Sequence, residues 1–257
     1  MLARSLPHHP FLVNLYWTWQ DSRYLYRVDD GFDDSEGEGE ERDINTWDEL
    51  VLRAAQLATA VHYIHSYGLI HGNIHPQSII LLPRSHTLKL TSFKYLRRVE
   101  GGRRLSGICG DLAEFRAPEC KDREYFEDID WYSYGKVLEY WHNENRGSLT
   151  EIINTVYIKD LIHRLTDGSD TNRLGYGPAA FKSVQSHAFF SSFNWTPLLN
   201  LSTRPDLKNS FTSLSQSIGS LKGRSDSTCD IWKEFLEFNW DEGGKIGQTL
   251  ESIIKKR

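Results

Sequence analysis

The longest periodic pattern in this chain of 257 residues is an apolar stripe at residues 46–65. Apolar side chains recur there at helical spacing, at Leu50, Ala54, Leu57, Ala58, Val61 and Ile64. Thr46, with Glu49 three residues later, forms a capping box, which is a signal for a helix start. A helix of this kind needs its apolar face covered by other elements. The stripe therefore predicts a helix packed into a sizeable globular core.

Shorter elements are predicted on both sides of this helix. Three segments favour strands, namely residues 9–32 as a hairpin around a turn at 20–22, residues 78–82, and residues 87–90. Further helices are predicted from Asp130, near residues 149–156 and near residues 159–165. The expected fold class is therefore α+β.

Composition and charge exclude several classes of protein. With 39% hydrophobic and 25% charged residues, the chain fits one large or two small globular domains. A net charge of -5 gives no reason to expect binding to nucleic acid or to a membrane surface. Residues 1–10 lack the apolar core of a signal peptide, and no apolar run is long enough to span a bilayer. We expect a soluble cytoplasmic protein, and a nuclear location stays open.

The three cysteines, Cys109, Cys120 and Cys229, form neither a C-x-x-C pair nor a dense disulfide framework. This usage favours a reducing compartment. We expect all three to be ordinary, partly buried thiols.

Four strings of residues follow one another in the order and spacing of a known family. They are His71-Gly72-Asn73-Ile74-His75-Pro76-Gln77-Ser78, then Leu90-Thr91-Ser92-Phe93-Lys94, then Arg116-Ala117-Pro118-Glu119 with Asp130-Trp131, and finally Asn172-Arg173-Leu174-Gly175 with residues 186–195. They resemble the H-R-D-x-x-x-x-N, D-F-G, A-P-E and R-L-G-x-G segments of eukaryotic protein kinases. The last segment is typical of AGC-type serine/threonine kinases.

The resemblance implies a protein-kinase-like α+β fold, with a mainly helical large lobe and a remnant β-hairpin of the small lobe. Four parts are expected along the chain. They are the hairpin and hinge at residues 1–32, an acidic loop at 33–45, the large lobe at 46–200 and an AGC-like C-terminal tail at 201–257. The acidic loop is interpreted as a solvated segment or as a dock for a basic segment.

The catalytic positions of the family are altered in this sequence. Asn73 replaces the Asp that acts as base, and Ser78 and Ser92 replace the two residues that hold magnesium. A neutral amide is no base near pH 7, and a hydroxyl is a weak metal ligand. His75 stands where a Lys contacts phosphate, and it is the one remaining group that could act as a base. We therefore expect no intact catalytic residue and no metal site.

The nucleotide site is also reduced. By resemblance, the chain begins just before the fourth strand of the small lobe, without a Gly-rich loop or a V-A-I-K lysine. The hinge equivalents are Asp30 and Phe32, and Asp29 replaces an apolar residue beside adenine. Burying an unpaired carboxylate there is costly. We expect no cofactor, and weak ATP and magnesium binding only if the chain is an active kinase.

The phosphate switch of the family is altered as well. Gly72 replaces the Arg that pairs with the phosphate, and Gly107 lies where the phosphorylated Thr is expected. Residues 103–106, Arg-Arg-Leu-Ser, resemble a substrate site for basophilic kinases. Whether Ser106 is phosphorylated stays open.

The resemblance also implies structural and partner-binding roles. Glu119 and Arg173 are expected to form a buried ion pair. His71, Phe93 and Asp130 match family positions that tie the lobes together, and His71 is interpreted as a core histidine. In the tail, a segment similar to the hydrophobic motif of AGC kinases offers three side chains for packing on the hairpin or on a partner, namely Phe235, Phe238 and Trp240.

Three functional hypotheses remain open. The first is a catalytically inactive pseudokinase that binds or scaffolds proteins, with no nucleic-acid or membrane partner. The second is an active, ATP-dependent serine/threonine kinase represented by a truncated sequence. The third is a decaying duplicate without a selected function. Under the first hypothesis we also expect self-association through the face that a small lobe would cover.

Overall fold

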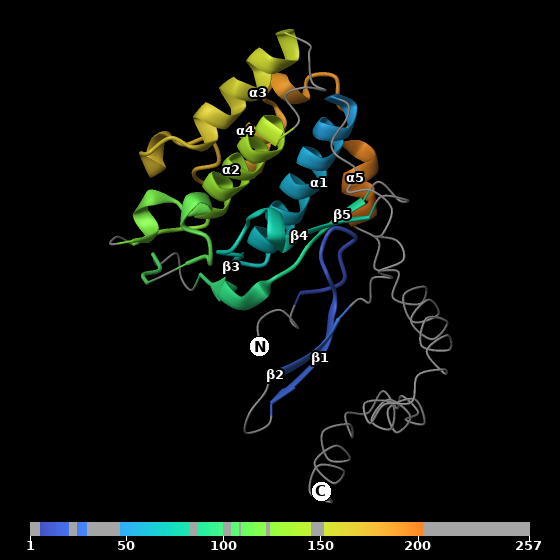
Figure 1. The fold of residues 1–257 in the computed structure, drawn as a ribbon, viewed down its shortest axis with the longest axis vertical. Coiled ribbons are helices and arrows are strands. Elements are labelled where there is room, and N and C mark those ends of the chain that lie inside the picture. The colour runs from blue at the N-terminus through green and yellow to red at the C-terminus, as the bar shows by residue number, and fades with distance from the viewer. Residues whose placement is uncertain are drawn as a thin grey trace, which may run out of the picture. The chain divides into compact units, whose positions relative to one another are not determined.

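The computed structural model describes residues 6–20, 25–29, 47–82, 87–99, 104–107, 109–121, 124–144 and 152–202 (Figure 1). These residues belong to one compact unit, Met1–Leu207. A second unit, Lys208–Arg257, lies outside the described residues together with the tail residues Phe235, Phe238 and Trp240. The hinge equivalents Asp30 and Phe32 and the expected helix cap Thr46 are also outside them.

Three long helices carry most of the core. Helix α1 (Trp47–Ser66) packs against α2 (Asp128–Glu144), and α2 packs against α3 (Ile152–Leu165) (Figure 1). The apolar stripe of α1 is fully buried, which confirms the predicted helix. The hydroxyl of Tyr134 in α2 donates a hydrogen bond of 3.1 Å to the carbonyl of Ala54 in α1. Two short helices, α4 (Ala180–Gln185) and α5 (Thr196–Ser202), also contact α1.

The prediction of two separate helices near residues 149–156 and 159–165 was wrong, because α3 is continuous. No Gly or Pro interrupts it, and Ile158, Leu161 and Leu165 are buried at helical spacing. Gly135 of α2 allows a close approach of the two helices, since a Cβ at this position would lie 2.7 Å from the Cβ of Leu165.

The strands form three small antiparallel sheets. They pair β1 (Leu15–Gln20) with β2 (Leu25–Asp29), β3 (Leu69–Ile70) with β6 (Arg97–Arg98), and β4 (Ile79–Leu82) with β5 (Thr87–Leu90). The predicted hairpin and the two predicted strands are thus confirmed. In β5, Leu88 and Leu90 alternate with less buried residues, as expected of a half-buried strand. The amide of Leu88 donates to Gln56 Oε1 of α1 at 2.9 Å, which fixes β5 on the helix.

The buried apolar residues form two clusters. The large one surrounds α1, α2 and α3. The smaller one, which we call the second cluster, consists of Ile70, Cys109, Ala117, Cys120, Tyr125 and Ile129. The mainly helical lobe with an N-terminal hairpin confirms the expected fold class. In the part of the chain that the structure describes, no helix is long and apolar enough to cross a membrane.

Candidate functional site

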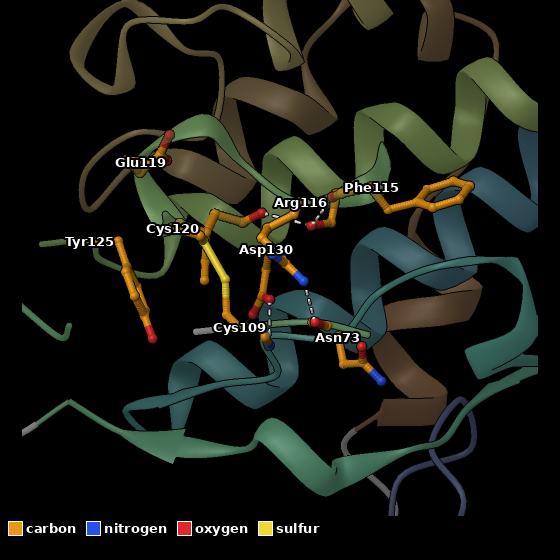
Figure 2. The surroundings of a disulfide bond; sticks show 12 residues. Asn73, Cys109, Phe115, Arg116, Glu119, Cys120, Tyr125 and Asp130 are labelled. Atoms are coloured by element: carbon orange, nitrogen blue, oxygen red, sulfur yellow. Dashed lines mark hydrogen bonds between the residues drawn. A yellow bond between two sulfur atoms is a disulfide. The ribbon is translucent and has the colours of Figure 1, made fainter. Parts of the chain in front are cut away.

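The loop that follows β3 is held in place by a carboxylate at the start of α2. Asp130 Oδ2 accepts a hydrogen bond from the amide of His71, and Oδ1 accepts one from the amide of Gly72, both at 2.8 Å (Figure 2). His65 Nε2 lies 2.8 Å from Oδ2. Burial opposes ionisation of Asp130, but the His65 hydrogen bond and the other donors outweigh it and lower its pKa. Asp130 is therefore a buried anion that orders the loop.

His71 is a fully buried histidine with both ring nitrogens hydrogen-bonded to backbone. Its Nε2 donates to the carbonyl of Thr91 at 2.9 Å, and its Nδ1 accepts from the amide of Asn73 at 3.2 Å. This pattern requires a proton on Nε2 only. Burial lowers the pKa of His71, which agrees with a neutral ring. The ring packs edge-on against Phe93, with 5.5 Å between the centroids.

Asn73, at the position of the family's base, has all its amide groups in use. Its Oδ1 accepts from the amide of Asp111 at 2.7 Å. Its Nδ2 donates to Asp111 Oδ2 at 3.2 Å and to Ser92 Oγ at 3.0 Å. Because the side chain offers two N–H groups and one carbonyl, these three bonds occupy both donors and one acceptor site. Asn73 and Asp111 thus bind each other in both directions.

Asp111 is a functional-site residue that the sequence reasoning missed. Its Oδ1 accepts from Lys94 Nζ at 2.8 Å and from the hydroxyl of Tyr95 at 3.0 Å. The Lys94 hydrogen bond is the largest of the effects that lower the pKa of Asp111. The residue lies seventeen positions from Lys94 and outside the family strings, so only the tertiary structure brings these groups together.

The two serines at the magnesium positions point to protein groups. Ser78 is fully buried, and its Oγ donates to the carbonyl of His75 at 2.8 Å and accepts from the His75 amide at 3.0 Å. These bonds close the short turn Pro76–Ser78. Ser92 has φ 66°, and among the described residues it is the only non-glycine in the left-handed region. Its Oγ accepts the bond from Asn73.

His75 is buried without a hydrogen bond to either ring nitrogen among the described residues. Its side chain lines a small cavity with Asn73, Cys109, Phe115 and Arg116, which has room for about one water molecule. Burial lowers the pKa of His75, and the nearby Asp111 opposes this effect. The ring is therefore neutral near pH 7.

The predicted ion pair between Glu119 and Arg173 is present and involves a third residue. Arg173 Nη1 and Nη2 donate to the two carboxylate oxygens of Glu119 at 2.6 and 3.1 Å. Nη1 also lies 2.9 Å from Asp128 Oδ2. Burial raises the pKa of Asp128 to about 6, although Arg173 opposes this effect. One buried cation thus faces two buried carboxyl groups.

The expectation that all three cysteines are unpaired was wrong for two of them. Cys109 and Cys120 form a disulfide, with a Cα–Cα distance of 6.1 Å (Figure 2). The two residues are 11 positions apart, and the short turn Pro118–Cys120 brings the second one back to the first. No local sequence pattern announces such a pair. Cys229 lies outside the described residues.

Two further predicted positions lie at the edge of the described structure. Asp29 is half-buried and pairs with Leu15 at the end of the β1–β2 hairpin. Ser106 is exposed, and its carbonyl accepts a hydrogen bond from Arg97 Nη1 at 2.8 Å. Neither position contacts the residues around Asn73 through a bond described above.

Comparison with known proteins agrees with these structural features. A family model, the protein kinase domain, matches residues 1–146. Ribosomal protein S6 kinase alpha-1 of Mus musculus is 26% identical over 214 residues, which cover 78% of this chain and 29% of that protein. Ribosomal protein S6 kinase 2 beta of Xenopus laevis is 26% identical, with 80% and 36% covered.

The cAMP-dependent protein kinase catalytic subunit PRKX of Homo sapiens is 24% identical, and the match covers 96% of this chain and 70% of that protein. The chain thus spans only 29% to 36% of the length of the S6 kinases named above. With the ordered loop at His71, the Glu119–Arg173 ion pair and the matched domain, the chain belongs to the protein kinase family and is of the AGC type.

Proposed function

We propose that this chain is a catalytically inactive kinase-family protein that acts by binding another protein. The observation that carries the proposal is the hydrogen-bond network of Asn73, Asp111 and Ser92. A substrate hydroxyl at the base position would meet a neutral amide whose two N–H groups are already bonded. It could reach Asn73 only by displacing Asp111, which Lys94 and Tyr95 also hold.

The residues at the family's metal positions do not fit magnesium. Magnesium binds carboxylate oxygens and retains several waters in a strict octahedral geometry. Here the two positions carry neutral hydroxyls, and Ser78 Oγ is bonded to the backbone of its own turn. Without a charged ligand at either position, the phosphates of a nucleotide have no metal to bridge them to the loop. This supports the inactive interpretation.

An active serine/threonine kinase using ATP and magnesium is the second candidate. The relatives described above are kinases by name, which favours it. Asp111 is the one acidic side chain bonded to the base position. Its carboxylate is paired with Lys94, and the low pKa that this pairing causes makes it a weak base.

Thermal unfolding of the full chain with millimolar Mg-ATP distinguishes the candidates. A ligand at a hundred times its dissociation constant stabilises a protein by about 2.7 kcal/mol, which shifts the midpoint by several degrees. We expect no shift relative to magnesium alone. A shift that EDTA abolishes, together with phosphate transfer to a serine peptide, would overturn the proposal.

The proposed protein partner calls for a separate experiment. We propose that Phe235, Phe238 and Trp240 contact the partner, because exposed aromatic clusters are common anchors in interfaces. Replacing all three by Ala in the full chain should abolish co-purification of a specific protein from native cells. The matched control replaces Tyr157, an exposed aromatic residue of α3. Equal co-purification by both variants would argue against this contact.

A further inference from the structure

The Cys109–Cys120 disulfide closes a loop that contains the residues bonded to the base position. The loop runs through Asp111 and the A-P-E segment (Figure 2). Both cysteines are buried, with 5% and 2% of their surface exposed, in the second cluster. In Figure 2 the side chain of Tyr125 is drawn on one side of the disulfide and Asp130 on the other.

The two ends of this loop are anchored differently. Cys120 directly follows Glu119, which Arg173 holds through two hydrogen bonds in the buried ion pair. Cys109 belongs to the segment that rests on the catalytic-type loop. A Cβ on Gly72 would lie 3.8 Å from the Cβ of Cys109, and a Cβ on Gly110 would lie 3.4 Å from the carbonyl of Gly72.

Noncovalent contacts hold residues 109–111 only in part. The side chains of Lys94 and Asp111 are 65% and 40% exposed, and ion pairs at such positions stabilise a protein little. Arg116 Nη2 donates to the carbonyl of Gly110 at 2.8 Å. The disulfide is the one covalent connection between this segment and the ion-paired anchor, so it restrains Asp111 more strongly than these contacts do.

We propose that Cys109 and Cys120 form a redox-sensitive restraint on the Asn73–Asp111 pair. In the oxidised chain, the segment is fixed and Asn73 is covered. In the reduced chain, Asp111 separates from Asn73 more often and the loop becomes accessible to a partner. This regulation is independent of whether the chain transfers phosphate.

The chemistry is thiol–disulfide exchange with a small-molecule disulfide, such as oxidised glutathione. One cysteine thiolate attacks it and forms a mixed disulfide, and the second cysteine then displaces the small thiol. The two protein thiols lose two protons and two electrons, and the small disulfide is reduced to two thiols. Because both sulfurs are buried, exchange requires local opening of the second cluster.

The first test measures the thiol state of the full chain. The protein is equilibrated in glutathione buffers of increasing oxidised fraction, alkylated, digested and analysed by mass spectrometry. We expect Cys109 and Cys120 to become protected together, as one linked peptide, while Cys229 stays reactive. Independent labelling of Cys109 and Cys120 at every ratio would overturn the proposal.

The second test measures backbone hydrogen exchange at Asp111, whose amide donates to Asn73. On reduction we expect exchange there to become at least about tenfold faster. The variants Cys109→Ser and Cys120→Ser should reproduce the reduced state, and Cys229→Ser should behave as the parent. Should one variant fail to fold, chemical reduction of the parent still gives the result. Equal exchange in both redox states would show that the disulfide does not restrain this pair.

Discussion

The start of α2 and the loop after β3 both contain buried polar side chains, but their charges are balanced in different ways. At the start of α2, the cation Arg173 lies between two carboxyl groups. In the loop, the neutral side chains of Asn73, Ser78 and Ser92 bond to one another, to Asp111 or to backbone. Removing one member of a buried ionic group leaves an unpaired charge, whereas a neutral network adapts at lower cost. The charges that support the fold are therefore present, and those that phosphoryl transfer requires are not.

The strongest test of this comparison is Arg173→Ala. It leaves Glu119 and Asp128 buried without their cation, so we expect the free energy of unfolding to fall by about 3 to 5 kcal/mol. Urea denaturation followed by far-UV circular dichroism measures it. The control is Arg164→Ala, because the pair of Arg164 with Asp160 is exposed and should contribute under about 1 kcal/mol. Similar losses in both variants would contradict the special role of the buried group.

Gly72→Ala tests whether the neutral loop tolerates a side chain at the family's Arg position. Gly72 has φ 69°, and an added Cβ would lie 3.2 Å from the carbonyl oxygen of Tyr95. We expect a loss of about 1 to 3 kcal/mol in the same urea assay. Gly168→Ala is the control, since its added Cβ meets no described atom within 4 Å. A stable Gly72→Ala protein would mean that the loop can readily rearrange.

Asn73→Asp restores the family's base but places a carboxylate against Asp111. The hydrogen bond from Nδ2 to Asp111 Oδ2 becomes a repulsion between like charges. We expect a loss of about 1 to 2 kcal/mol near neutral pH and no phosphate transfer. The double variant with Asp111→Asn should recover most of the stability in a double-mutant cycle. A single variant that transfers phosphate would instead show that one residue blocks the activity.

The smallest effect is expected from the pH dependence of Asp128. Burial raises its pKa from 3.8 to about 6, so the folded protein binds this proton more tightly than the unfolded chain. The stabilisation is therefore present at low pH and is lost as the pH rises through about 6. Between about pH 5 and about pH 8, we expect the parent to lose about 1 kcal/mol relative to Asp128→Asn. Urea titrations of both proteins at the two pH values measure this difference, and parallel pH profiles would contradict it.

The sequence predicted those parts of the site that depend on local patterns. The helix α1 follows from its apolar period, and the Glu119–Arg173 pair follows from two family strings. Asp111, Asp128 and the disulfide could not be predicted in this way. Each depends on a tertiary contact between residues without a local signature, such as Asn73 with Asp111. The number of ways to pair cysteines also exceeds what spacing alone can resolve.

Ser92 has a consequence for engineering this protein. A non-glycine residue in the left-handed region carries a backbone cost that Asn bears better than Ser, and Asn also offers an oxygen acceptor. Substitutions that fit an existing backbone conformation commonly stabilise a protein, because natural chains are seldom at their stability optimum. Ser92→Asn is therefore a simple route to a more robust protein for crystallisation, and its benefit comes from the same position that once would have held magnesium in an active relative.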